Sequence, residues 1–441
     1  MSYQATMDYL FSKLPMFSRI GAAAIKHNLD NTIAICNYLG HPEKHFKTIH
    51  IAGTNGKGST SHMLASIFQE AGYKTGLYTS PHLYDFRERI KVNGKMCSKE
   101  FVIDFTNQIR PFIEKNEPSF FEITVGMSFD FFAKEQVDIA IIETGLGGRL
   151  DSTNIIHPEL SIITNIGFDH MALLGNTLEA IASEKAGIIK NETPVVIGEA
   201  NDATKDVFLS KAAHENAPIY FADDFIQFKS FQNNWSTALF EFNQPLIHLI
   251  DAPLFSKNFT IECDLPGKYQ AKNLKAVLVA AQLLSSMGWK LSANKVMKAL
   301  LNVQKNTGLM GRWECIYTNP RVILDVAHNE HGIIALLEQL KALHYLQLHI
   351  VTGMVKDKDI QAVLKLLPTD ASYYFTQSHI PRALPVQELA EQAKALGLNG
   401  NAFEDVNIAL TEAIKNANHN DLILVIGSVF LVAEVDRAMF K

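Results

Sequence analysis

The first residues in this sequence that suggest chemistry form a glycine-rich loop with a lysine. Residues 49–64, IHIAGTNGKGSTSHML, run from an apolar segment through three glycines and Lys57 into a pattern with helical spacing. A strand, a glycine loop and a helix in this order bring backbone N–H groups and a helix N-terminus together around an anion. The segment therefore predicts a phosphate-binding loop in which Lys57 adds a positive charge.

The spacing of this loop differs from the common P-loop pattern. That pattern, G-x-x-x-x-G-K-[ST], would place a glycine where Ile51 stands and a hydroxyl residue directly after Lys57. Here Gly58 follows the lysine, and Ser59 comes one position later. A glycine-rich turn that leads into a surface helix is the alternative interpretation of the loop taken alone.

Polar residues also stand at the ends of further strand-like segments. Ser80 ends KTGLYTS, Glu143 ends VDIAIIE, and Asp169 and His170 follow LSIITNI. In an open parallel sheet, ligands bind beyond the carboxyl ends of the strands, so these ends would form one site if the strands share a sheet. The combination suits a nucleotide with magnesium, with Lys57 on the phosphates and Ser80 and Glu143 as oxygen ligands.

Each of these residues also has an ordinary structural explanation. A glutamate at a strand end can be solvated, a histidine after a strand can be structural, and Ser80 before Pro81 can open a turn. Their joint placement beyond a glycine loop favours the functional interpretation.

The elements that would position these residues alternate between strands and helices. This alternation is typical of a parallel sheet with helices on both faces. The strand-like segments are KTIHIAG, KTGLYTS, VDIAIIETG, LSIITNIG and TPVVIG, and the helical ones are residues 59–72, 120–135 and 176–190. The predicted fold is therefore α/β with a mostly parallel sheet.

The second half of the chain indicates a change of domain. Residues 222–263 alternate aromatic and polar positions and predict a small antiparallel subdomain. Two helical segments, residues 268–287 and 292–302, precede the polar stretch QKNTGLMGR, and a new series of strands begins with RVILDVAHN. The predicted organisation is a first domain over residues 1–303, a linker over 304–312 and a smaller α/β domain over 313–441.

Composition restricts the class of protein. The 441 residues are 47% hydrophobic and 20% charged, which is typical of a globular chain with more than one domain. A formal net charge of −6 without a long charged block argues against nucleic acid or an anionic membrane as the main partner. The 4 cysteines are scattered singly, and the sequence shows neither a signal-peptide pattern nor a long apolar stretch. We therefore expect a cytoplasmic protein.

Longer motifs, taken in order, carry a resemblance to a known family. They are GTNGKGST, TSPHLYDFRERI, ETGLGGRLDSTN, ITNIGFDH, SEKAGIIK, LDVAHN and GMVKDKD. Together they resemble the folylpolyglutamate synthase and dihydrofolate synthase family, a branch of the Mur ligase superfamily. The resemblance implies a P-loop central domain followed by a Rossmann-like C-terminal domain. It also implies ATP-dependent amide ligation, in which a carboxylate becomes an acyl phosphate and the amine of L-glutamate displaces phosphate.

The resemblance assigns roles to residues at the phosphate end of the site. It implies that Ser80 and Glu143 ligate one Mg²⁺ and that His170 meets a second Mg²⁺ near the incoming carboxylate. A bridging cation is expected because carboxylate and phosphate oxygens repel one another. The implied contacts to ATP are Thr54, Asn55, Gly56, Lys57, Gly58, Ser59, Asn273, Arg312 and Asp325. The resemblance also allows a monovalent cation such as K⁺.

Lys57, His170 and Lys185 are the implied catalytic residues. Lys185, in SEKAGIIK, matches a lysine that the family carbamylates to N6-carboxylysine, which would turn a cation near magnesium into a carboxylate. Its alternative is a helix-surface lysine that pairs with a neighbouring glutamate. His328 and Ser428 match positions near the incoming glutamate, at strand ends of the second domain.

The implied contacts to the pterin or folate substrate come from three segments. They are Arg19, Ile20, Gly21, Ser119, Phe120, Phe121, Glu122, Leu150, Asp151 and Ser152. Phe120 and Phe121 can stack on a flat ring, but a phenylalanine pair at a helix start is more often part of a core. The implied acceptors are dihydropteroate, a folate γ-carboxylate, or both.

Other functions remain as alternatives. A P-loop small-molecule kinase would stop at phosphoryl transfer, and a nucleotide-gated binding module would bind ATP without hydrolysing it. A UDP-MurNAc-peptide-type Mur ligase is disfavoured by the folate-type segments TSPHL and GGRLDSTN and by the position of GTNGK, with no separate substrate domain ahead of it. We expect a monomer that binds small molecules, with neither nucleic acid nor a membrane as a partner.

Overall fold

The structure of the protein is a computed structural model that describes residues 2–16, 28–244, 252–356 and 358–440. The chain divides into two compact units. The first unit comprises Met1–Gln232, Leu239–Asp264 and Gln270–Gly308, and the second comprises Asn233–Ala238, Leu265–Tyr269 and Leu309–Lys441. The pterin contacts predicted at Arg19, Ile20 and Gly21 lie outside the described residues.

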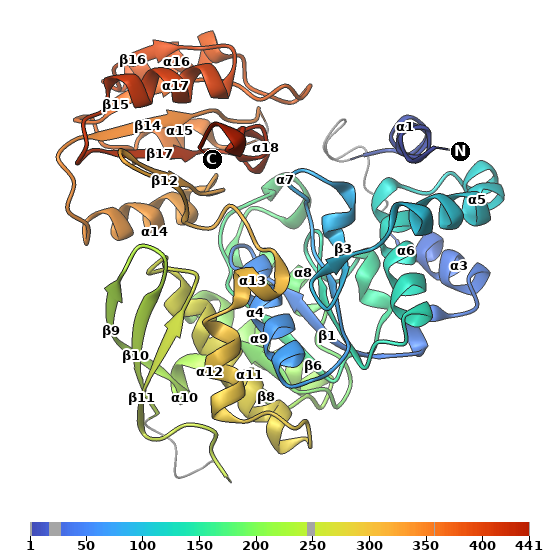
Figure 1. Cartoon of the computed structure of the whole chain (residues 1–441). Coiled ribbons are helices and arrows are strands. Elements are labelled where there is room, and N and C mark those ends of the chain that lie inside the picture. Colours follow the sequence, from blue (N-terminus) through green and yellow to red (C-terminus); the bar gives the residue numbers. More distant parts are fainter. Residues whose placement is uncertain (1, 17–27, 245–251, 357, 441) are drawn as a thin grey trace. The chain divides into compact units, whose positions relative to one another are not determined.

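The first unit is built on an eight-stranded sheet (Figure 1). Its order is β4 (Lys95–Met96), β3 (Ile90–Val92), β2 (Thr75–Tyr78), β5 (Ile139–Glu143), β1 (Lys47–Ala52), β6 (Leu160–Ile163), β7 (Val195–Ile197) and β8 (Ile219–Phe221). The strands from β2 to β8 in this order are parallel, and β3 and β4 extend the sheet in antiparallel orientation. The predicted α/β fold with a mostly parallel sheet is confirmed.

Helices cover both faces of this sheet, which explains why its central strands are apolar on both sides. One face is covered by α3 (Asp30–Tyr38), α5 (Lys99–Asn116), α6 (Phe120–Lys134), α8 (Leu178–Ala186) and α9 (Asp202–His214). The opposite face is covered by α4 (Lys57–Glu70), α11 (Gln270–Ser286), α12 (Ala293–Leu300) and α13 (Val303–Thr307). The helix α4 begins directly at Lys57, so its N-terminus lies at the end of β1.

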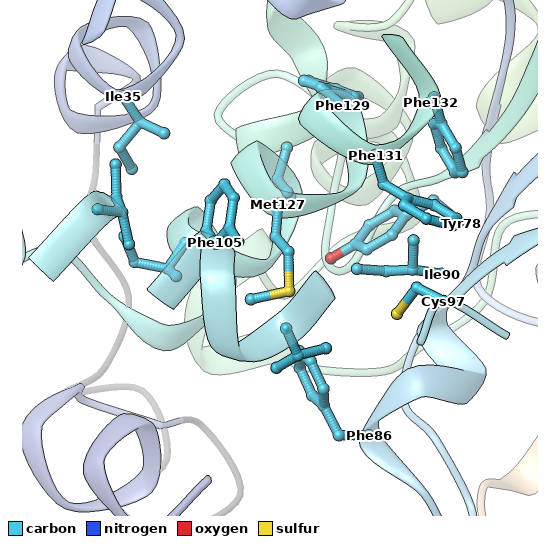
Figure 2. Packing of buried hydrophobic residues seen from close by; sticks show 14 of the residues in the cluster. Ile35, Tyr78, Phe86, Ile90, Cys97, Phe105, Met127, Phe129, Phe131 and Phe132 are labelled. Carbon is cyan, nitrogen blue, oxygen red and sulfur yellow. The ribbon is translucent and has the colours of Figure 1, made fainter. Parts of the chain in front are cut away.

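An apolar core on the first face fixes the strands that carry the predicted site. Figure 2 shows Phe105 of α5 close to Met127 of α6, and Phe131 of α6 close to Tyr78 of β2 and Ile90 of β3, within one buried cluster. Each side chain of this kind stabilises the fold by about 1.5–3 kcal/mol when it is buried. The core therefore holds β2 and its neighbour β5 in place against α5 and α6.

A separate three-stranded sheet follows α10 (Ala222–Phe225) in the sequence. Its order is β11 (Asn258–Cys263), β10 (Ala238–Asn243) and β9 (Gln227–Asn233). Phe240 and Phe242 are buried, and the ring centroids of Phe242 and Phe259 lie 5.6 Å apart. The small additional sheet predicted over residues 222–263 is confirmed.

The second unit has its own six-stranded sheet. Its order is β12 (Glu314–Thr318), β13 (Arg321–Leu324), β17 (Leu422–Ile426), β14 (Leu348–Thr352), β15 (Ser372–Phe375) and β16 (Gly400–Ala402), with only β12 antiparallel to its neighbour. The helices are α14 (Glu330–Leu340), α15 (Ile360–Leu364), α16 (Val386–Ala395), α17 (Val406–Asn416) and α18 (Val429–Ala433). This is the second α/β sheet predicted from the sequence.

The predicted linker over residues 304–312 begins inside a helix. The Asp264 carboxylate accepts a hydrogen bond from the Gln304 backbone N–H at 2.8 Å, and α13 continues to Thr307. The chain passes to the second unit only after Gly308.

The remaining described elements are short or peripheral. They are α1 (Tyr3–Lys13), α7 (Met171–Leu174) and the 3-10 turns η2 (Pro42–Lys44), η3 (Phe86–Arg89), η4 (Ser152–Ile155) and η6 (Arg437–Phe440). Across the described ranges, no helix has the length and hydropathy needed to cross a membrane.

Candidate active site

The ends of four strands meet at one edge of the first unit's sheet. β2, β5, β1 and β6 are consecutive parallel neighbours, so their carboxyl ends point the same way. Ser80 follows β2, Glu143 ends β5, and Asp169 follows β6. The Ser80 backbone N–H donates to the Glu143 carboxylate at 3.3 Å. The structure thus brings together residues that the sequence places far apart.

The glycines of the loop are required by the close approach of other segments. Gly53 has a φ of +150°, and a Cβ at this position would lie 1.8 Å from Thr164 Oγ1. Gly56 has a φ of +83°, and its Cβ would lie 2.1 Å from Asn273 Oδ1. Neither distance leaves room for a side chain. Asn273 therefore lies against the loop, although its contact with ATP stays a prediction.

Residues after β6 hold the loop in its conformation. The Thr54 N–H donates to the Asn165 backbone oxygen at 3.0 Å, and the Asn55 N–H donates to Asn165 Oδ1 at 2.9 Å. These two N–H groups are thus used within the protein. The first turn of α4, whose N-cap Gly56 carries no capping side chain, is the part of the loop where the predicted anion would bind.

Asn165 is a site residue that the sequence analysis missed. It lies inside the motif ITNIGFDH, near the end of the predicted strand-like segment LSIITNIG and two residues after the observed end of β6, and that position was the available signal.

Two lysines converge on one backbone oxygen of the loop. Lys57 Nζ donates to the Gly53 oxygen at 3.1 Å, and Lys185 Nζ donates to the same oxygen at 2.9 Å. Lys185 is only 3% exposed. Burial, reinforced by the Lys57 charge, lowers the pKa of Lys185 to about 7, against the opposing effect of Asp169 and Asp151. A large part of Lys185 is therefore a neutral amine at neutral pH.

His170 follows the same strand end and precedes α7. Its φ is +51°, its backbone N–H donates to Asp169 Oδ1 at 2.9 Å, and its Nε2 lies 3.8 Å from that oxygen. In the described part of the chain, His, Cys, Asp and Glu side chains form no group of three or more suited to a metal. A cation here would rely on the Ser80 hydroxyl, the Glu143 carboxylate and oxygens of its substrates, which fits Mg²⁺.

Asp151 organises the loop that follows Glu143. Its Oδ2 accepts from the N–H groups of Gly145 and Leu146, both at 2.8 Å. Its Oδ1 accepts from the Thr153 N–H at 3.0 Å and the Thr153 hydroxyl at 2.6 Å. Burial raises the pKa of Asp151, and these hydrogen bonds oppose the rise. The carboxylate thus holds the backbone next to Glu143, and its direct contact with a pterin stays a prediction.

His50, in the middle of β1, extends this network. Its Nε2 lies 2.8 Å from Thr153 Oγ1. Because the Thr153 hydroxyl proton is given to Asp151, we assign the proton on His50 to Nε2. Burial lowers the pKa of His50 to about 3, so its ring is neutral.

The predicted pterin segment at the start of α6 caps that helix and contributes a side chain to the core. Ser119 and Glu122 form a capping box, with the Ser119 N–H donating to Glu122 at 2.6 Å and the Glu122 N–H donating to the Ser119 hydroxyl at 3.2 Å. Phe120 is 5% exposed and belongs to the core. The Phe121 ring lies 2.5 Å from where a Cβ on Gly145 would stand, so it packs against the loop after Glu143. Only Phe121 of the pair adjoins the candidate site.

Leu150 and Ser152 flank Asp151 and are partly buried. Their contacts with a substrate stay predictions.

Ser59 is buried against α11 and is 1% exposed. Its hydroxyl accepts from Gln270 Nε2 at 3.1 Å, and Gln270 Oε1 accepts from Asn273 Nδ2 at 2.7 Å. The hydroxyl that stands one position too late for the common P-loop pattern is therefore engaged with α11.

In the second unit, Asp325 holds the segment that carries Arg312. The carboxylate of Asp325, directly after β13, accepts from the Tyr269 hydroxyl at 2.8 Å and from the backbone N–H groups of Trp313 and Ala327, both at 2.9 Å. Burial raises the pKa of Asp325, whereas the Arg312 charge lowers it. Its oxygens thus position the chain next to Arg312.

His328 and Ser428 lie at the carboxyl edge of the second unit's sheet. They follow the neighbouring parallel strands β13 and β17, and the Gly427 N–H donates to the Ala327 oxygen at 3.0 Å. The Ser428 hydroxyl caps α18 by accepting from the Phe430 N–H at 3.1 Å. The structure thus brings these two predicted residues to one edge.

The fold and the loop define the class of this protein as a Mur ligase. Residues 51–281 match the Mur ligase middle domain, and residues 311–429 match the Mur ligase glutamate ligase domain. Within that class, the chain belongs to the family of the dihydrofolate synthases and folylpolyglutamate synthases. It is 32% identical to the dihydrofolate synthase/folylpolyglutamate synthase of Bacillus subtilis, over 99% of both chains. The resemblance read from the motifs is confirmed.

Solved structures support the same assignment. The folylpolyglutamate synthase of Mycobacterium tuberculosis complexed with ADP is 28% identical, with a TM-score of 0.86 over 100% of this chain and 98% of that one. A bifunctional folylpolyglutamate synthase/dihydrofolate synthase with Mn, AMPPNP and L-glutamate bound is also 28% identical, with a TM-score of 0.82 over 100% of this chain and 98% of that one.

Proposed function

We propose that this chain joins L-glutamate to the carboxylate of dihydropteroate, to the γ-carboxylate of a folate, or to both, with conversion of ATP to ADP and phosphate. A carboxylate is a poor electrophile, so its oxygen first takes the γ-phosphoryl group of ATP. The glutamate amine then attacks the carbonyl carbon of the acyl phosphate, and phosphate leaves with that oxygen. The observation that carries the proposal is the convergence of the phosphate loop, Ser80 and Glu143 at adjacent strand ends.

The start of α4 would bind the phosphates of ATP. Its first N–H groups and the positive end of the helix dipole favour an anion, and Lys57 adds a charge from the same turn. Thr54 and Asn55 would act by keeping the loop in place rather than through their own N–H groups. Asn273 would approach the nucleotide beside Gly56.

A divalent cation would be held by Ser80 and Glu143, with a second one at His170. When bound, these cations would screen the repulsion between the phosphate and carboxylate oxygens. Two Mg²⁺ ions are the proposed number, and the monovalent cation such as K⁺ has no proposed ligands among the described residues.

Lys185 is proposed to carry a carbamate. Two ammonium groups that share the Gly53 oxygen would repel one another, and the lowered pKa of Lys185 supplies the neutral amine that attacks CO₂. The amine nitrogen forms a bond to the carbon of CO₂, and one proton is released to solvent. The product is an anion next to Lys57, which replaces a repulsive pair by an attractive one.

The second unit is proposed to supply Arg312 to the ATP phosphates and His328 and Ser428 to the incoming glutamate. Asp325 supports Arg312 through the hydrogen bonds to Trp313 and Tyr269.

The test is ADP release with L-glutamate and, in separate reactions, dihydropteroate or tetrahydrofolate. We expect turnover that needs both the carboxylate acceptor and glutamate, and loss of that turnover in Lys57→Ala. Sustained ADP release without glutamate would instead indicate a kinase, and no turnover with either acceptor would contradict the proposal.

A further inference from the structure

One face of α4 carries a row of buried polar side chains whose hydrogen bonds to other helices take no part in the proposed chemical steps. Ser59, His62 and Ser66 are separated by three and four positions, so they lie on the same side of the helix. Their exposed fractions are 1%, 4% and 0%. Each is hydrogen-bonded to a residue near a point where the chain passes from one unit to the other.

The first contact holds the start of α11. Ser59 accepts from Gln270, which is the first residue after the segment Leu265–Tyr269 of the second unit. The N-terminal end of the phosphate helix therefore holds the point at which the chain returns to the first unit.

Two further contacts hold the end of α13, which packs against α4. Thr307 Oγ1 donates to the Val303 oxygen at 2.6 Å and lies 2.7 Å from His62 Nδ1, so we assign a proton to that nitrogen. Asn306 Nδ2 donates to Ser66 Oγ at 3.0 Å. These bonds fix the two residues before Gly308, where the chain leaves the first unit.

Other buried groups complete the anchorage of α13. Lys91 Nζ, from β3, donates to the Thr307 oxygen at 2.8 Å. Asp264, the last residue before the segment Leu265–Tyr269, accepts from the Gln304 N–H at 2.8 Å. The five-residue helix α13 thus links to α4 the two places, after Asp264 and after Gly308, where the chain leaves the first unit.

We propose that Ser59, His62 and Ser66, named here the hinge row, are positioning residues that fix the start of the interdomain connection relative to the phosphate loop. The inference rests on the proposed function, because the hinge row acts through Arg312. Arg312 lies four residues after Gly308, and a chain spans at most about 3.5 Å per residue. The reach of Arg312 from Gly308 is therefore limited to about 14 Å. The position of α13 on α4 fixes the position of Gly308 and therefore the region that Arg312 can reach.

The polar character of the contact supports a positioning role. Apolar side chains on this face of α4 would be buried as well but would let α13 slide along α4, whereas hydrogen bonds at His62 and Ser66 allow one register.

The test compares Thr307→Val and Ser66→Ala with Thr106→Val. Thr106, on α5, also donates its buried hydroxyl to the oxygen four residues earlier, at 2.7 Å, but lies outside the hinge row. We expect the two hinge variants to lower kcat about tenfold at saturating substrates while the Kd for ATP stays within about twofold. Thr106→Val should change neither, and Thr307→Ser, which keeps the hydroxyl, should restore kcat.

The outcomes separate this inference from the proposed function. Equal kcat in Thr307→Val, Ser66→Ala and Thr106→Val would overturn the hinge role, as would a parallel loss of ATP affinity. An inactive wild-type enzyme would instead count against the ligase reaction. If Thr307→Val does not fold, the test uses Ser66→Ala with spin labels at the exposed positions 38 and 408, and the distance between the two labels is measured. The distance distribution between the labels should broaden relative to wild type, and an unchanged distribution would overturn the inference.

Discussion

At the scale of single residues, the Lys57 and Lys185 pair is the most unusual feature of the site. Two amines approach one carbonyl oxygen, and the buried one has a pKa of about 7 instead of 10.5. The neutral fraction of Lys185 therefore rises between pH 6 and pH 8, the range in which carbamate formation should increase.

The first prediction concerns this lysine. Lys185→Ala should lower kcat by about 10²-fold, because it removes the anion that is proposed to pair with Lys57 and to hold the Lys57 charge in place for the phosphates. In ¹³CO₂-saturated buffer, wild type should show a carbamate carbon signal in NMR that Lys185→Ala lacks. Lys190→Ala, which removes another partly buried lysine, should keep the signal. A signal that survives Lys185→Ala would assign the carbamate elsewhere.

The second prediction concerns the network of His50, Thr153 and Asp151. Thr153→Val leaves the buried His50 Nε2–H without its acceptor and removes one bond to Asp151, so the free energy of unfolding should fall by about 1–3 kcal/mol. Denaturant unfolding measures this loss. The same change at Thr106 removes only a local helix bond and should cost less than half as much, so equal losses would show that the network adds nothing.

Some features of the candidate site could be predicted from the sequence, and others could not. The gathering of Lys57, Ser80 and Glu143 at one edge could be predicted because each stands at or just after the end of an apolar strand, and neighbouring parallel strands end at the same edge. The hydrogen bonds from the Thr54 and Asn55 N–H groups to Asn165 could not be predicted, because they depend on how closely two loops approach each other. The core position of Phe120, beside the partly exposed Phe121, likewise depends on which side of α6 faces the sheet.

At the scale of elements, the loop and α4 depend on backbone conformations that only glycine adopts readily. Gly40 and Gly56 have similar φ values of +79° and +83°. A Cβ on Gly40 meets nothing within 4 Å, whereas one on Gly56 would lie 2.1 Å from Asn273 Oδ1. The pair therefore separates backbone strain from steric overlap.

The third prediction uses this pair. Gly40→Ala should lose about 1 kcal/mol of stability from the left-handed backbone and keep its ATP affinity. Gly56→Ala should lose more stability than Gly40→Ala and, because Asn273 and the loop must separate, weaken ATP binding by about tenfold or more. Isothermal titration with ATP measures the difference. Equal ATP affinities in the two variants would contradict the geometry of the loop.

The fourth prediction concerns the start of α13. Burial raises the pKa of Asp264 from 3.8 to about 6, so the folded protein holds this proton more tightly than the unfolded chain. The folded state is thus favoured by this group below pH 4, and that contribution is lost as the pH rises through 6. The stability of wild type relative to Asp264→Asn should fall by roughly 1–3 kcal/mol between pH 4 and pH 7. A difference that stays constant over this range would contradict the assignment.

At the scale of the whole molecule, sequence periodicity was sufficient to predict the two α/β sheets and their order along the chain. It was less informative at their junction. Residues 304–307 look like a polar linker in the sequence, yet they form part of α13, because Asp264 and Lys91, both distant in sequence, bond backbone groups at the two ends of that helix. The expected monomeric state stays a prediction.

The fifth prediction concerns substrate choice. One phosphate loop and one edge with Ser80 and Glu143 provide one place for an activated carboxylate, so dihydropteroate and tetrahydrofolate should compete if both are substrates. Each should inhibit ligation of the other with a constant equal to its own KM. Noncompetitive inhibition would indicate two separate acceptor sites.

In the proposed reaction, the γ-phosphoryl group of ATP is transferred to the substrate carboxylate before glutamate reacts. The most direct measurement uses an acceptor labelled with ¹⁸O in that carboxylate, followed by mass spectrometry of the released phosphate and the ligated product. We expect one labelled oxygen in the released phosphate for each amide formed. Amide formed with unlabelled phosphate would contradict the proposed reaction.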